Sequence, residues 1–151
     1  MRRALPDARP FHTIGSMPKT FTVEQANRTL PLVSRIVHDI VTLYPRWCDR
    51  MNELELLAGG ARSDASDPRI GELEAELQEI ASEIDSYIGE LAALGVEYKQ
   101  PIDAGLVDFP GIIDGRRIYY CWRVGEPAVD HWHELDAGFA GRRSVHTVAL
   151  A

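Results

Sequence analysis

The chain has 151 residues, enough for one domain with a modest hydrophobic core. Its net charge of -7 excludes the broadly basic surface that nucleic acids or anionic membranes attract, so we expect neither as a partner. The two cysteines, Cys48 and Cys121, are too few for a disulfide framework and favour a reducing, cytoplasmic location. No apolar run reaches the length of a membrane span.

The N-terminus reads as an extension outside the folded domain. Residues 1–20 are predicted to be disordered, because their beginning is rich in Pro and Arg and lacks the apolar stretch of a signal peptide. Both Met1 and Met17 are possible start sites. We expect a single domain over residues 21–143 and a flexible C-terminus over residues 144–151.

A first helix is predicted over residues 22–58. Thr22 and Gln25 have the spacing of a capping box, in which each satisfies a free backbone N–H of the other. Apolar residues then recur at alternating steps of four and three, as in a coiled coil. They are Ala26, Leu30, Val33, Val37, Ile40, Tyr44, Trp47, Met51 and Leu54. Pro31 and Pro45 predict local bends in one continuous helix, because the register persists across both.

A second helix is predicted over residues 68–94. Asp67 and Pro68 suit its N-cap and first position, and Gly95 suits a left-handed C-terminal cap. A short loop joins two helices with matching apolar seams, which predicts an antiparallel, coiled-coil-like hairpin.

The open end of this hairpin carries a second set of apolar residues that lie off the seam. They are Leu32, Ile36, Leu43, Ala81, Ile88 and Ala92. Such a face needs a cover. The C-terminal tail, a second copy of the chain, or both are candidates, and a second copy would make the protein a homodimer.

The tail, residues 96–143, is predicted to be rich in β-structure. Residues 96–99 and 106–109 suit short strands, and Pro110-Gly111 suits a bend. Asp114-Gly115 lies between two β-branched and aromatic runs, which is a strong hairpin signal. Residues 128–143 read as an irregular loop. The predicted class is therefore α+β, a long two-helix hairpin with a small C-terminal antiparallel β-hairpin or sheet.

The tail is dense in side chains that bind metals or move protons. They are Glu126, Asp130, His131, His133, Glu134 and Asp136. In an extended segment His131 and His133 share a face, whereas in a helical turn Asp130 and Glu134 do. Mixed imidazole and carboxylate ligands suit zinc, iron or manganese. We take His133, Glu134, Asp136 and His131 as the candidate metal ligands; a loop salt-bridged by Arg123 and Arg142 is the structural alternative.

Three further residues have two readings each. Asp108 could complete a metal shell or cap a turn, and Glu24 could do the same or favour the dipole of the first helix. Cys121 reads as an inert core thiol unless a partner such as His133 lies close. A small-molecule pocket of tail aromatics, with Arg123 or Arg142 holding an anion, is also open. No phosphate loop, nucleophile elbow or HExxH motif is present, so enzymatic activity stays undecided.

Several segments together resemble one known family. They are FTVEQANRTLPLV, LGVEYK, GLVDFPGIIDGRRIYYCWRVGEP and HWHELDAGFAGR. In order and spacing they resemble a bacterial family of uncharacterised proteins, the domain of unknown function 2203, over residues 21–143. The resemblance implies a helical middle and draws attention to His133, Glu134, Asp136 and Arg142, whereas His131 falls outside the family's pattern. It implies no established activity. The favoured function is divalent-metal binding; the alternative is a non-catalytic hairpin that homodimerises or binds a partner protein.

Overall fold

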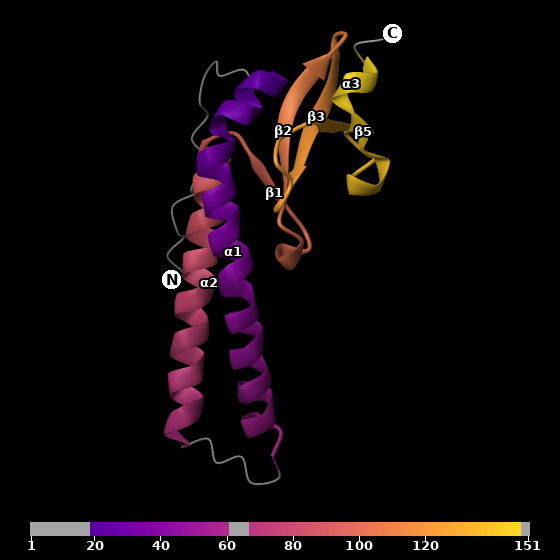
Figure 1. The fold of residues 1–151 in the computed structure, drawn as a ribbon. Helices are drawn as coiled ribbons and strands as arrows, with labels where there is room; N and C mark the ends of the chain where they lie inside the picture. The colour runs from indigo at the N-terminus through magenta and orange to yellow at the C-terminus, as the bar shows by residue number, and fades with distance from the viewer. Residues whose placement is uncertain (1–18, 61–66, 149–151) are drawn as a thin grey trace, which may run out of the picture.

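A computed structural model describes residues 19–60 and 67–148 of the chain. Residues 1–18, 61–66 and 149–151 lie outside the described part. They include most of the predicted N-terminal extension and the end of the predicted flexible C-terminus. A long helical hairpin lies beside a small antiparallel sheet (Figure 1). The predicted α+β class is therefore confirmed.

The hairpin consists of α1 (Val23–Ala58) and α2 (Pro68–Ala93), which pack along their lengths. Both bonds of the predicted capping box form, with Gln25 N–H donating to Thr22 Oγ1 at 3.1 Å and Thr22 N–H donating to Gln25 Oε1 at 3.0 Å. Asp67 caps α2 by accepting from the Arg69 N–H at 2.8 Å. α1 continues through both internal prolines, and its first turns are inclined to the rest of the helix (Figure 1).

The sheet has five strands in the order β1-β2-β3-β4-β5, each antiparallel to its neighbours. They are β1 (Glu97–Lys99), β2 (Leu106–Ile113), β3 (Arg116–Arg123), β4 (His131–Glu134) and β5 (Arg143–Ser144). Two 3-10 turns, η1 (Ile102–Ala104) and η2 (Phe139–Gly141), and a short helix, α3 (Val145–Val148), complete the described part. Residues 128–143, expected to be irregular, thus contain β4 and η2, and residues 144–148 contain the end of β5 and α3.

The β2–β3 turn forms at the predicted position. Asp114 and Gly115 both have positive φ angles, of 50° and 75°, as a two-residue hairpin turn requires. The prediction of a bend at Pro110-Gly111 was wrong, because β2 continues through both residues. Proline is tolerated there because the pairing of β2 with β1 ends at Asp108, so no neighbouring strand needs the missing N–H. On that open edge the Pro110 carbonyl instead accepts from the Phe21 N–H at 2.7 Å.

One face of the sheet packs against the helices and forms the core. Phe109, Tyr120 and Trp132 are cross-strand neighbours on this inner face, and all are buried. Each such side chain contributes about 1.5–3 kcal/mol through burial. Ile36 and Leu43, two of the off-seam residues, belong to the same core, so the tail covers them. Homodimerisation and partner binding stay predictions.

An asparagine joins the start of α1 to the segment before β4. Asn27 Oδ1 accepts from the Val129 N–H at 2.8 Å, and Asn27 Nδ2 donates to the Val129 carbonyl at 2.9 Å. Both main-chain groups of one residue are therefore bound by one side chain, which fixes β4 relative to α1.

The far end of the hairpin is held by charges. Arg69 forms a two-pronged ion pair with Glu53, at 2.8 and 3.0 Å, and also reaches Glu72 and Glu76. No helix within residues 19–60 and 67–148 combines the length and apolarity that crossing a bilayer requires.

Candidate metal centre

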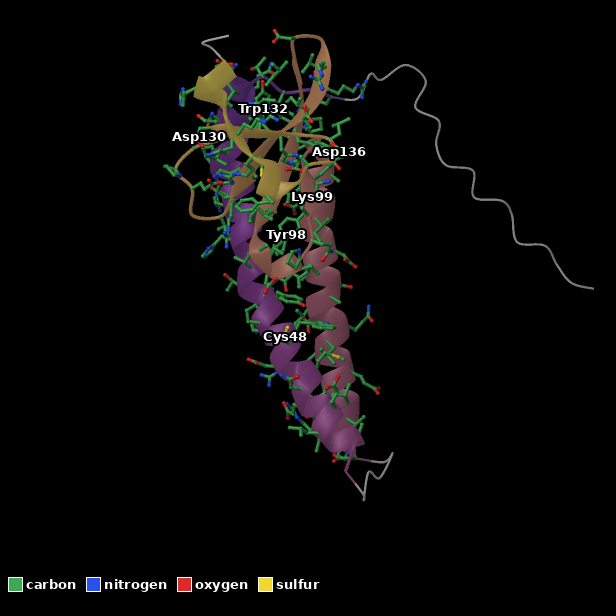
Figure 2. All side chains as sticks on the ribbon, turned by 90° about the vertical axis from the view of Figure 1, so that its right-hand side faces the viewer. Cys48, Tyr98, Lys99, Asp130, Trp132 and Asp136 are labelled. Atoms are coloured by element: carbon green, nitrogen blue, oxygen red, sulfur yellow. The ribbon has the colours of Figure 1, made fainter. Side chains whose placement is uncertain are left out.

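The sheet face that points away from the helices is polar. Residues paired across strands share a face, and the pairing places Glu97, Asp108, Cys121 and His131 in one row. His133 lies two residues beyond His131 on β4 and so shares this outer face. Both histidines therefore face the same way, as the extended alternative predicted. Figure 2 looks at the side of the molecule where Lys99, Asp130 and Asp136 surround this part of the sheet.

Three ligand-type side chains converge on the outer face. Asp108, Cys121 and His133 are only 3%, 2% and 3% exposed, although two of them are polar or charged. One ligand atom of each lies within 4.8 Å of the others. Asp108 Oδ1 is 3.0 Å from His133 Nε2. A carboxylate, a thiol and an imidazole thus meet at one buried point, from three different strands.

The surroundings of the His133 ring determine where its proton lies. Its Nδ1 is 2.7 Å from the carbonyl oxygen of Glu134. A carbonyl only accepts, so Nδ1 carries the hydrogen. The other nitrogen, Nε2, faces the Asp108 carboxylate, which in its ionised form also only accepts. This contact is therefore favourable only if one of the two atoms carries a hydrogen or if both bind one metal ion.

Burial disfavours charge on the two acidic members of the group. It raises the pKa of Asp108, although His133 and Lys99, whose Nζ lies 3.8 Å from Oδ2, act in the opposite direction. Burial, with a contribution from Asp108, also raises the pKa of Cys121 to about 12. Without a bound cation Cys121 is therefore a thiol, and neither ring nitrogen of His133 is available to deprotonate it.

A cavity of about 320 Å³ opens beside the group. Its lining includes all three ligand-type residues, together with Lys99, Gln100, Leu106, Leu135, Asp136, Gly138 and Phe139. A ligand from outside could therefore reach the point where Asp108, Cys121 and His133 meet.

A second group, of Glu126, Asp130 and His131, lies on the same sheet face. His131 Nδ1 is 2.6 Å from Asp130 Oδ1 and 3.9 Å from Glu126 Oε2. Arg142 donates to both oxygens of Glu126, at 2.8 and 2.6 Å. Burial alone would raise the pKa of Glu126, but the hydrogen bonds from Arg142 and from the Arg123 N–H lower it.

The other predicted site residues lie away from His133's ring. Glu134 points to the opposite side of β4 and pairs with Arg116 at 3.3 Å. Asp136 is exposed on the lining of the cavity. Arg123 is exposed, with its guanidinium 5.6 Å from the Phe139 ring. Glu24 lies in the first turn of α1. Burial and, to a smaller extent, the Glu24 charge raise the pKa of Tyr120 on the inner face of the sheet. The structure thus joins His133 to Asp108, and joins His131, Glu126 and Arg142 in a separate group.

Cys121 is the site residue that sequence reasoning left in the core. The signal that could have found it is the two-residue turn at Asp114-Gly115. Counting back equally from that turn along both strands sets Asp108 opposite Cys121. The bend expected at Pro110-Gly111 interrupted this count.

A family model described as an uncharacterized conserved protein, DUF2203, matches residues 19–145. The chain belongs to this family. All members of both ligand-type groups lie within the matched range. Neither the search of curated proteins nor the search of solved structures gave a match.

Proposed function

We propose that this DUF2203 protein binds one divalent transition metal ion through Asp108, Cys121 and His133. The observation that carries the proposal is the buried contact between His133 Nε2 and Asp108 Oδ1 at 3.0 Å, while the Nδ1–H of the same ring donates to the Glu134 carbonyl. In metal-bound histidines, the nitrogen that does not bind the metal commonly donates its N–H to such a carbonyl. This hydrogen bond directs the lone pair of the other ring nitrogen toward the ion.

The donor set favours zinc over calcium or magnesium. One thiolate, one imidazole and one carboxylate are ligands that Zn²⁺ binds, at roughly 2.0–2.3 Å. Iron and manganese accept the imidazole and the carboxylate equally well, but the sulfur favours zinc. A divalent ion with two anionic ligands is also neutral overall, which suits residues as buried as Asp108 and Cys121.

The cavity leaves room for a fourth ligand. Three protein ligands with an open position facing a cavity are typical of catalytic zinc sites, whereas structural sites are closed by four protein ligands. A metal-bound water in that position would be activated as a nucleophile. The proposed function is therefore an accessible metal centre, with no particular reaction assigned to it.

The competing reading is a cysteine nucleophile activated by histidine. Two features argue against it: the pKa of Cys121 is raised to about 12, and both nitrogens of His133 already face acceptors. Nucleophilic cysteines need the opposite, a lowered pKa and a base within reach. A bound metal removes this difficulty, because coordination deprotonates the thiol.

The test compares variants at paired positions on the same chain. Zinc content and zinc affinity are measured for the full-length protein and for Cys121→Ser and His133→Ala. The matched controls are Cys48→Ser, at the other thiol, and His131→Ala, at the other histidine of β4. We expect about one equivalent of zinc in the wild type and both controls, and at least a hundredfold weaker binding in the two site variants.

Folding of each variant is checked by circular dichroism, so that a lost site is distinguished from a lost fold. A wild type that stays metal-free after growth and dialysis with zinc, iron and manganese would contradict the proposal. Equal metal content in Cys121→Ser and Cys48→Ser would remove the thiolate from the ligand set.

A further inference from the structure

We infer that the open side of this centre binds the carboxylate group of a small acid with an apolar body. The inference rests on the proposed metal site and adds the chemical class of its ligand. It is carried by the position of Lys99, by the composition of the cavity wall and by the charge balance of the three protein ligands.

Lys99 places a positive charge at the edge of the metal position. Its Nζ lies 3.8 Å from Asp108 Oδ2, on the same carboxylate whose other oxygen contacts His133. It lies 3.2 Å from Glu97 Oε1 and 5.0 Å from the centre of the Tyr119 ring, so it is held in place from two sides. An ammonium has three donors, and these contacts leave capacity for a ligand oxygen.

The charges of the ion and its protein ligands bear on the role of Lys99. A divalent ion with the Asp108 and Cys121 anions and a neutral His133 has no net charge. Arg142 is paired with Glu126 through two bonds, and Lys99 is paired with Glu97 through a single contact that leaves ammonium hydrogens free. A carboxylate with one oxygen on the ion and the other near Lys99 would therefore share the ammonium with Glu97.

The remaining wall of the cavity is largely apolar. Leu106, Leu135 and Phe139 contribute side chains and Gly138 contributes backbone. A volume of about 320 Å³ lies at the small end of the range of ligand cavities. Asp136, the other acid of the lining, is exposed and lies with Lys99 on the side of the sheet shown in Figure 2. It disfavours a second negative charge on the ligand, so a monocarboxylate fits better than a dicarboxylate.

The test uses the full-length protein loaded with Co²⁺, whose absorption reports its ligands. A cobalt–thiolate charge-transfer band reports Cys121, and a change of the visible bands on titration reports a new ligand at the open position. The probe is phenylacetate, and phenylacetamide is its uncharged match of the same shape. We expect saturable spectral changes with phenylacetate and none with phenylacetamide.

Two lysine variants then test the role of the charge. Lys99 and Lys19 are the two lysines of the chain, so Lys99→Gln and Lys19→Gln alter the net charge equally. We expect Lys99→Gln to retain the cobalt–thiolate band and to bind phenylacetate about tenfold more weakly. Lys19→Gln is expected to behave as the wild type.

The possible results distinguish failure of the metal site from failure of the carboxylate site. Absence of the thiolate band in the wild type would overturn the metal site and this inference with it. A thiolate band that phenylacetate leaves unchanged would overturn this inference alone. Equal phenylacetate affinities for Lys99→Gln and Lys19→Gln would overturn the role of Lys99 and the charge argument.

Discussion

Two groups of ligand-type residues share one face of the same sheet, and each contains a histidine of β4. In one, Asp108 and His133 are almost fully buried beside Cys121. In the other, His131 and Glu126 are partly exposed and Arg142 binds the carboxylate with two hydrogen bonds. Both groups combine a histidine with carboxylate, but only the first contains a thiol. They also differ in the cation beside the carboxylate: Arg142 bonds directly to Glu126, whereas Lys99 lies 3.8 Å from Asp108.

This comparison explains why a cluster in the sequence divides in the folded protein. In the other group, Arg142 already binds the Glu126 carboxylate with two hydrogen bonds, although His131 Nδ1 makes no well-formed hydrogen bond. In the Asp108 group, Asp108 Oδ1 and His133 Nε2 face each other almost fully buried, which is unfavourable unless one carries a hydrogen or both bind a metal ion. We therefore propose the Asp108 group, with its thiol, as the metal site.

The largest effect is expected from removing the arginine. Arg142→Met keeps the contact with Phe139 but leaves Glu126 partly buried without its partner. We expect a loss of about 2 kcal/mol in the free energy of unfolding, measured by urea denaturation. Arg143→Met is the control, because Arg143 is exposed and stacks on Trp132. An equally large loss of stability in Arg143→Met would mean that the ion pair between Arg142 and Glu126 does not account for the effect.

Asp108→Asn should have opposite effects on stability and on metal binding. An Asn amide can donate to Nε2 of His133 and carries no buried charge, so we expect the metal-free variant to be more stable than the metal-free wild type by about 1 kcal/mol. Zinc should stabilise the wild type and not the variant, as measured by thermal unfolding with and without zinc. Asp136→Asn, at an exposed position, should change neither. A less stable metal-free Asp108→Asn would contradict the prediction and mean that the protonated Asp108–His133 contact is stronger than the Asn–His133 hydrogen bond.

The smallest effect concerns pH. The pKa of Glu126 is lowered in the folded protein, so its ion pair stabilises the fold above the ordinary carboxyl value of about 4.3, and this contribution is lost as pH falls through the lowered value. The stability difference between wild type and Glu126→Gln should therefore narrow between about pH 5 and pH 3, by less than about 1 kcal/mol. In an Arg142→Met background the narrowing should be smaller, since only the Arg123 N–H and the neighbouring His131 still lower the pKa of Glu126. A constant difference across this range would contradict the assignment of the shift to Arg142.

Much of the fold follows from local patterns. The alternating apolar spacing, the capping box at Thr22 and the Asp67-Pro68 start placed both helices within a residue or two of their observed ends. The Asp114-Gly115 pair placed the hairpin turn. Each of these signals acts over a few residues, so the sequence displays it directly.

The site was harder to predict because its residues are brought together by sheet register. Asp108 and His133 are separated by 25 positions and belong to strands that are not neighbours. The Glu134 and Asp136 candidates were chosen for closeness in sequence to His133, but alternation along β4 turns Glu134 to the other side. Arg142 could be predicted as a partner for the acids, but which acid it binds depends on how residues 135–142 return over the sheet.

The Asn27–Val129 contact bears on the order of events during synthesis. It spans 102 positions, so the strand that carries both histidines cannot take its final place until almost the entire chain has emerged. The helical hairpin, whose contacts are local, can form well before that point. Metal capture would then be the final step of maturation, and a chain truncated before Val129 would keep its helices and never acquire the centre.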